Sequence, residues 1–213
     1  TVYGLRYAYR ISGMKEMRVI LPSIERPKKL PVVLGHNEVR QLLKAPKLLK
    51  HRLVLAMLYG CGLRSFELCN LQLKDLDLER MMLHIRQGKG RKDRYVPLCA
   101  MQVRGLRKYI SAERPVTWCF NGNDSKGDPV ALSTTGVQWI VREARKHSGI
   151  QKEVTTHSLR HSYATHLLEM GLDIISVKDL LGHADIQTTL TYLHVAQLGR
   201  QRPFSPLERL YNK

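Results

Sequence analysis

The chain has 213 residues, which at roughly 150 residues per domain corresponds to one full domain and part of a second. Its 43% of hydrophobic residues exclude a disordered basic tail, and its 35 Lys and Arg against 18 Asp and Glu, a formal net charge of +17, exclude an ordinary neutral metabolic domain. The favoured partner is therefore nucleic acid, with an anionic membrane surface as the alternative.

The N-terminal part of the chain combines a short helix with a linker. Residues 1–14 have the pattern of a helix end, whereas residues 17–31 contain three prolines, several basic residues and no helical pattern. We expect the helix to be the remnant of an N-terminal domain. The expected units are this remnant at 1–16, a basic linker at 17–31, a main domain at 32–197 and a tail at 198–213.

The first half of the main domain changes from a helical to a strand pattern. Apolar residues have helical spacing in 39–43 and 53–58, and a short helix is expected at 65–71. Residues 81–86 alternate between apolar and polar, a Gly-rich basic turn follows, and a second strand runs through 95–97. This pattern predicts a β-hairpin with a basic tip.

The second half returns to helical spacing from Met101 onward. A loop rich in Gly, Asn and Asp is expected at 121–129, and glycines end three of the helices that follow. The predicted helices lie at about 134–147, 157–170, 174–181 and 187–196. The expected fold class is therefore mainly α with a small antiparallel β-sheet (α+β).

Membrane insertion and disulfide bonding are not expected. No apolar run approaches the roughly 18 to 20 residues of a membrane span, and the N-terminus lacks the apolar block of a signal peptide. We therefore expect a soluble, cytoplasmic protein. The four cysteines, Cys61, Cys69, Cys99 and Cys119, form no CxxC pair, so they are interpreted as reduced packing residues.

Four segments contain residues suited to chemistry at a phosphodiester. His157 and Arg160 are three residues apart, so on a helix they share a face, in a first turn that Thr155 or Thr156 would cap. Taken singly, each candidate also has an ordinary structural explanation, such as a surface Arg, a solvated turn or a packed aromatic. The candidates are Arg64 in GCGLRSFEL, Lys89 in QGKGRKDR, His157 and Arg160 in THSLRHSYATHLL, and His183 and Tyr192 in LLGHADIQTTLTYLH.

Together these residue types suit phosphoryl transfer. Two Arg side chains match two non-bridging phosphate oxygens and keep their charge. A Lys donates a proton to the departing sugar oxygen if nearby cations lower its pKa from about 10.4. A Tyr becomes a nucleophile once Arg and His donors stabilise its phenoxide. The phosphotyrosine keeps the energy of the broken bond, so resealing needs no ATP, metal or other cofactor.

A metal site is the alternative explanation of the histidines. His157 and His161 are four residues apart, which is the spacing of a helical metal site. However, Arg160 lies between them, and no Asp or Glu occurs between Glu153 and Glu169. His166 lies close by in the same motif. Because a cationic cluster repels a divalent ion, we predict no metal at these histidines and none elsewhere in the chain.

The motifs GLRSFEL, GKGRKDR, THSLRHSYATHLLEMG and LLGHADIQTTLTYLHV closely resemble, in order and spacing, the catalytic domain of the tyrosine recombinases, also called the phage integrase or Xer-like family. The resemblance covers roughly residues 20–197 and implies the fold of that catalytic domain. Lys92 lies on the same hairpin as Lys89, but the first Lys after the Gly fits the pattern. The catalytic residues implied by the resemblance are Arg64, Lys89, His157, Arg160, His183 and Tyr192.

Three further residues in these motifs lie outside the implied catalytic set. Glu67 is similar to the acid that orients the first catalytic Arg in the family, here Arg64. His161 and His166 are interpreted as residues that pack or support the helix. The basic residues expected to contact DNA phosphates lie on the linker and the hairpin: Arg26, Lys28, Lys29, Arg86, Arg91, Lys92 and Arg94.

The resemblance implies a site-specific DNA recombinase or integrase, of a mobile element or of Xer type. Such an enzyme cuts one strand at a time through a 3′-phosphotyrosine and a free 5′-hydroxyl, then exchanges and reseals strands. The implied partners are double-stranded DNA, clamped with the help of an N-terminal core-binding domain, and three further copies of the chain in a tetramer on two duplexes. The tail is expected to dock on a neighbouring protomer.

Two other functions use a similar fold. A type IB topoisomerase has nearly the same active set, but the LLGH…TY block and the short distance to Tyr192 disfavour it. A catalytically silent DNA-binding regulator is disfavoured by the complete set of active residues.

Overall fold

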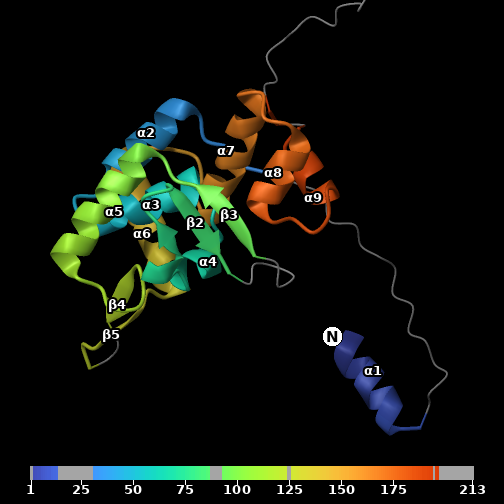
Figure 1. Ribbon diagram of the computed structural model, residues 1–213. Coiled ribbons are helices and arrows are strands. Elements are labelled where there is room, and N and C mark those ends of the chain that lie inside the picture. Colours follow the sequence, from blue (N-terminus) through green and yellow to red (C-terminus); the bar gives the residue numbers. More distant parts are fainter. Residues whose placement is uncertain (1, 14–30, 87–92, 124–125, 194, 197–213) are drawn as a thin grey trace, which may run out of the picture.

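The computed structural model describes a mainly α-helical domain with two small antiparallel sheets (Figure 1), which confirms the predicted fold class. The described residues are 2–13, 31–86, 93–123, 126–193 and 195–196. The helices are α1 (Val2–Ile11), α2 (His36–Lys44), α3 (Leu49–Gly60), α4 (Ser65–Cys69), α5 (Ala100–Glu113), α6 (Thr134–Ser148), α7 (Thr156–Glu169), α8 (Ile174–Leu181) and α9 (Gln187–Leu190). The strands are β1 (Leu76–Asp77), β2 (Met82–Ile85), β3 (Arg94–Pro97), β4 (Asn121–Asn123) and β5 (Pro129–Ala131). Within the described ranges, no helix combines the length and apolarity that crossing a membrane requires.

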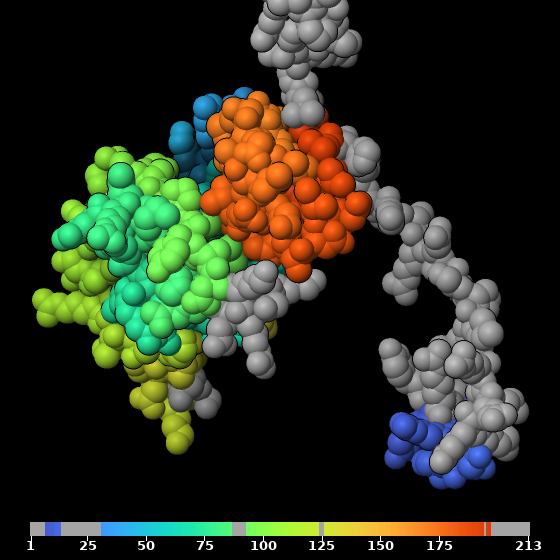
Figure 2. Space-filling model, turned by 45° about the vertical axis from the view of Figure 1, so that its right-hand side comes forward, coloured from blue at the N-terminus to red at the C-terminus, as the bar shows by residue number. Residues whose placement is uncertain are grey.

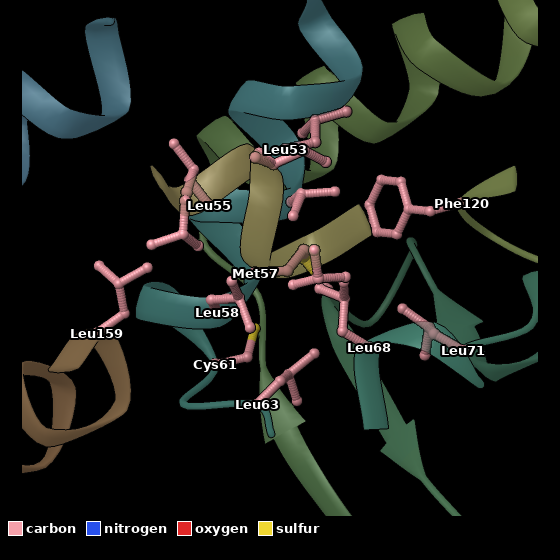
Figure 3. Close-up of a cluster of buried hydrophobic side chains, with 14 of the residues drawn as sticks. Leu53, Leu55, Met57, Leu58, Cys61, Leu63, Leu68, Leu71, Phe120 and Leu159 are labelled. Atoms are coloured by element: carbon pink, nitrogen blue, oxygen red, sulfur yellow. The ribbon is translucent and has the colours of Figure 1, made fainter. Parts of the chain in front are cut away.

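Helix α3 lies at the centre of the main core because its apolar residues occur on every side. Every residue of 53–58 except Ala56 is buried, and such a helix needs neighbours all round. Helices α2, α5, α6 and α7 pack against it. Figure 3 shows the α3 side chains meeting Phe120 and Leu159, which come from distant segments.

The predicted hairpin is confirmed as β2 and β3, with β1 added as a third strand. Leu83 pairs with Val96, and Ile85 pairs with Arg94. Paired residues share one face of an antiparallel sheet, and this face is buried. Arg94 is thus directed into the domain together with its apolar neighbours.

A second apolar cluster is formed by α7, α8 and the residues that follow α9. Figure 2 shows these helices, in orange and red, directly against the green surface that includes β3, and α8 contacts β3. Gly62 packs against this second cluster: its φ is +58°, and a Cβ there would be 2.4 Å from Tyr163 Cδ1. Glycine alone fits this backbone and this contact. The members of the second cluster are Tyr163, Ala164, Leu168, Val177, Leu181 and Tyr192.

Three predicted segments differ from the structure or lie outside it. The last predicted helix, 187–196, ends at Leu190 as α9, because the following backbone forms short i to i−3 turns such as Tyr192 N–H to Thr189 O (3.0 Å). The predicted loop at 121–129 contributes to the hairpin β4–β5, whose strands of three residues each are too short to show a clear alternation. The linker, apart from Pro31, and the tip of the β2–β3 hairpin lie outside the described residues.

Gly62→Ala tests the close contact with Tyr163, and Gly149→Ala is the matched control. Both glycines have positive φ, but a Cβ on Gly149 meets no atom within 4 Å. We expect Gly149→Ala to lower the free energy of unfolding by about 1 kcal/mol, and Gly62→Ala to lower it by about 2 kcal/mol more, because the added methyl group also displaces Tyr163. Urea unfolding measures both losses, and equal losses would contradict the contact.

Candidate active site

Glu67 is a buried carboxylate that contacts three arginines. Arg94 donates a hydrogen bond to each of its oxygens (2.9 and 2.8 Å), Arg64 donates one (2.7 Å), and Arg160 Nη1 lies 3.9 Å away. The Glu67 side chain is 4% exposed. Burial raises the pKa of Glu67, but hydrogen bonds and charge from Arg94, the Arg64 amide and Arg160 outweigh it and hold the pKa at about 2. Glu67 therefore stays ionised at neutral pH.

The same three arginines are also held by backbone carbonyls at the C-terminal end of α8. The last carbonyls of a helix have no partner within it and carry the negative end of the helix dipole. Guanidinium groups therefore suit this position. The donor and acceptor pairs are Arg94 with Leu180 O (2.8 Å), Arg160 with Leu181 O (2.5 Å) and Arg64 with Gly182 O (3.5 Å).

Among the described members of the predicted catalytic set, Arg160 is the most deeply buried cation. It is 3% exposed and also donates to the carbonyl of Gly62. Burial and the neighbouring charge of Arg64 lower its pKa to about 10, partly offset by Glu67. Arg160 is therefore still a cation at neutral pH. The neighbouring Arg64 is half-buried.

Tyr192 is 3% exposed, and its hydroxyl oxygen lies 3.1 Å from His161 Nδ1. Burial raises the pKa of the Tyr192 hydroxyl, whereas the charges of Arg160 and Arg64 act in the opposite direction. Burial, His157 and Arg160 lower the pKa of His161, so its ring is neutral at pH 7. Sequence reasoning missed this contact, although His161 is one helical turn after His157.

The two remaining described members of the predicted set flank this pair. His183 Nδ1 lies 2.9 Å from the hydroxyl of Thr189, and its ring is 6.2 Å from the ring of Tyr192. His157 is exposed, with its ring 6.3 Å from that of His161. His183, after α8, therefore lies beside the tyrosine, and His157 lies beside His161 on α7.

His157 and Arg64 line one open cleft of about 790 Å³. The hydroxyl of Ser65 donates to Thr156 (2.9 Å), which joins the first residues of α4 and α7 on its wall. Helix α6 contributes polar and basic side chains to the same cleft: Gln138, Arg142 and Arg145.

The expectation that Arg94 contacts DNA phosphates is wrong. Arg94 is 9% exposed, and its guanidinium is bound to Glu67 and to the carbonyl of Leu180. Alternation along β3 directs it inward, whereas Arg86 is exposed and pairs with Asp75. The other predicted positions on the linker and hairpin tip lie outside the described residues: Arg26, Lys28, Lys29, Lys89, Arg91 and Lys92.

The sequence model of the phage integrase family matches residues 32–198. The chain belongs to the phage integrase family. An integrase/recombinase of Sinorhizobium fredii is 40% identical over 191 residues, which are 90% of this chain and 61% of that family member. The tyrosine recombinase XerA of Thermococcus kodakarensis is 38% identical over 196 residues, which are 91% of this chain and 69% of that protein. The chain thus spans about two thirds of these relatives.

Solved structures of phage integrase family members have the same fold. A crystal structure of XerA recombinase superposes with a TM-score of 0.71 at 29% identity, covering 99% of this chain and 73% of that one. XerH recombinase, solved with a palindromic difH substrate after cleavage, superposes with a TM-score of 0.70 at 28% identity, covering 92% of this chain and 56% of that one. The catalytic-domain fold implied by the motifs is thereby confirmed.

Glu67→Gln tests the ion cluster through its pH dependence. The pKa of Glu67 is lower in the folded state than its ordinary 4.5, so its stabilisation is complete above that value and is lost as the pH falls toward about 2. At pH 6 we expect the variant to be about 3 kcal/mol less stable in urea unfolding, because it leaves buried arginines unpaired.

Between pH 6 and pH 3, this difference from the wild type should shrink by about 2 kcal/mol. Glu143→Gln, which removes a half-buried carboxylate 4.0 Å from His147 on α6, serves as the control and should show no such change. A difference that stays constant over this pH range would show that Glu67 titrates normally.

Proposed function

We propose that this chain is the catalytic part of a site-specific DNA recombinase that cleaves and rejoins strands through a 3′-phosphotyrosine at Tyr192. The observation that carries the proposal is the ion cluster, which holds Arg64 and Arg160 close enough for their charges to act on the Tyr192 hydroxyl. Two guanidinium groups beside one nucleophile match the two non-bridging oxygens of a phosphodiester.

In the proposed cleavage, Tyr192 Oη attacks phosphorus, and the bond from phosphorus to the 5′ oxygen breaks. Neutral His161, 3.1 Å from the hydroxyl, takes the tyrosine proton. Lys89 is the proposed donor of a proton to the 5′ oxygen. Arg64 and Arg160 balance the negative charge of the pentacoordinate transition state, and His157 and His183 donate hydrogen bonds to its oxygens.

Rejoining is the reverse of cleavage. A 5′-hydroxyl of the partner strand attacks phosphorus, the bond to Tyr192 breaks, and the tyrosine regains its proton. One phosphodiester bond replaces another at each step, so the proposed cycle needs neither ATP nor a cofactor. The protein needs only to hold the cleaved DNA ends in place until the strands have exchanged.

Double-stranded DNA is the proposed partner. The cleft beside Arg64 and His157 is lined by Arg142 and Arg145, Arg86 is exposed nearby on the sheet, and the chain carries a net charge of +17. The difH complex of XerH supports the same partner class. We further propose phosphate contacts by the linker and hairpin-tip residues, action in the cytoplasm, and a homotetramer on two duplexes.

The proposed organisation follows the family. Residues 32–197 form the catalytic domain, residues 1–16 end a core-binding domain, residues 17–31 link the two, and residues 198–213 dock on a neighbouring protomer. The family match to residues 32–198 supports the catalytic unit.

A nicked suicide substrate tests the nucleophile. A library of nicked duplexes with randomised sequence is incubated with the protein, and DNA that remains attached to it in detergent is collected and sequenced. We expect a covalent adduct for the wild type and none for Tyr192→Phe, because the phenylalanine has no attacking oxygen. Tyr95→Phe, at a tyrosine that is 61% exposed, is the control and should form the adduct normally.

An adduct formed by Tyr192→Phe would disprove this nucleophile. Recovered sites can then be placed on two labelled duplexes and on a supercoiled plasmid. Strand exchange between the duplexes supports a recombinase, whereas relaxation of the plasmid without exchange identifies a topoisomerase. Binding without any adduct in the wild type identifies a silent regulator.

A further inference from the structure

Thr189 is a buried polar residue that contacts two of the proposed active-site residues. It lies on α9, which packs against α8 (Figure 1), and it is 0% exposed. Its hydroxyl oxygen lies 2.9 Å from Nδ1 of His183, and its backbone carbonyl accepts a hydrogen bond from the Tyr192 N–H (3.0 Å). One residue therefore joins the histidine that follows α8 to the proposed nucleophile.

The burial of the Thr189 hydroxyl decides the direction of its hydrogen bond to His183. Within the described part of the chain, His183 Nδ1 is the one hydrogen-bond partner of this hydroxyl. If Nδ1 were the donor, the hydroxyl proton would be buried without an acceptor, which is destabilising. The hydroxyl is therefore the donor and Nδ1 the acceptor. A neutral imidazole that accepts at Nδ1 carries its proton on Nε2.

The backbone holds the two residues in place. The His183 N–H donates to the carbonyl of Lys178 (3.1 Å), which fixes the histidine to the last turn of α8. The Thr189 N–H donates to the carbonyl of Ile186 (2.8 Å). The branched side chain of a buried threonine has few alternative orientations. The contact between Thr189 and His183 is therefore well defined before any substrate binds.

We propose that Thr189 is a positioning residue that holds His183 as the Nε2–H tautomer, oriented to donate to an oxygen of the transition state. This inference rests on the strand cleavage proposed for Tyr192. The other neutral tautomer would present a lone pair at Nε2, which repels a negatively charged oxygen. With Thr189 in place, the neutral ring is already a donor at Nε2, so it takes no extra proton from solution and does not reorganise during cleavage.

The neighbouring threonines provide the contrast that a test needs. Thr188 and Thr191 are exposed, and the Thr191 hydroxyl donates to the carbonyl of Thr188 (2.8 Å). Thr189→Val removes the hydroxyl but keeps the branched shape and the backbone bond to Tyr192. Thr189→Ser keeps the hydroxyl. Thr188→Val makes the same change as the first variant at an exposed position one residue away.

Nitrogen-15 NMR of the chain labelled at its histidine rings tests the tautomer without DNA. At about pH 8 an ordinary imidazole is neutral, and its two nitrogen resonances show which atom carries the proton. The His183 signals are identified by their loss in His183→Gln. We expect a protonated Nε2 and an unprotonated Nδ1 in the wild type, Thr189→Ser and Thr188→Val. In Thr189→Val the two resonances should move toward each other, because both tautomers become populated.

The rate of covalent adduct formation tests the role in cleavage. Single-turnover rates are measured at saturating concentrations of a nicked duplex recovered from the library. We expect Thr189→Val to slow adduct formation by about tenfold or more, while the dissociation constant of the DNA changes little, because the donation strengthens in the transition state. Thr189→Ser should recover most of the rate, and Thr188→Val should match the wild type.

Three results would overturn the proposal: a wild-type His183 with its proton on Nδ1, an unchanged rate in Thr189→Val, or a serine variant as slow as the valine variant. Failure of the wild type to form any adduct would instead refute the proposed function. The spectra would still decide the tautomer in that case, so the two failures are distinguishable.

Discussion

The contact of Glu67 with three arginines is the interaction on which the rest of the site depends. A carboxylate that is 4% exposed is tolerated only when it is paired, and Arg94 pairs with both of its oxygens. Arg64 precedes α4, Arg94 begins β3 and Arg160 lies on α7, so one carboxylate fixes three distant segments. Three guanidinium groups against one carboxylate leave an excess of two positive charges. This excess of positive charge would attract a negatively charged phosphodiester.

Helix α8 connects this cluster to the tyrosine. Its last carbonyls accept hydrogen bonds from the arginines, and Leu181 in the same turn packs in the cluster that contains Tyr192. Gly182, which ends α8 with φ of +61°, would place a Cβ 3.0 Å from Arg94 Nη1. The end of one helix therefore sets both the position of the cations and the packing of the proposed nucleophile. Because they share this support, a change at one is expected to move the other.

The sequence predicted the parts that depend on local chemistry. The glycines expected to end α6, α7 and α8 all have positive φ. Of the predicted catalytic residues, Arg64 and His157 line one cleft, and Arg64 and Arg160 contact one buried carboxylate. The sequence did not predict that Arg94 points into the domain, or that His161 contacts Tyr192. Both depend on tertiary packing. Alternation along a strand does not say which of its two faces is buried until the sheet packs against α8, and the contact of His161 with Tyr192 joins residues 31 positions apart in the sequence. Strands of three residues, such as β4 and β5, are too short to show a periodic pattern in the sequence.

The role of Arg94 is the most direct test of this account. Two quantities are measured for the wild type and for Arg94→Met: the single-turnover rate of covalent adduct formation at saturating DNA, and the dissociation constant of the same DNA. Both are measured at a temperature where circular dichroism shows that the variant is folded. Because Arg94 acts through Glu67, we predict that adduct formation slows by about 10- to 100-fold while the dissociation constant changes by less than about twofold. Weaker binding that explains the whole loss, with an unchanged rate at saturation, would mean that Arg94 contacts DNA and would contradict the account.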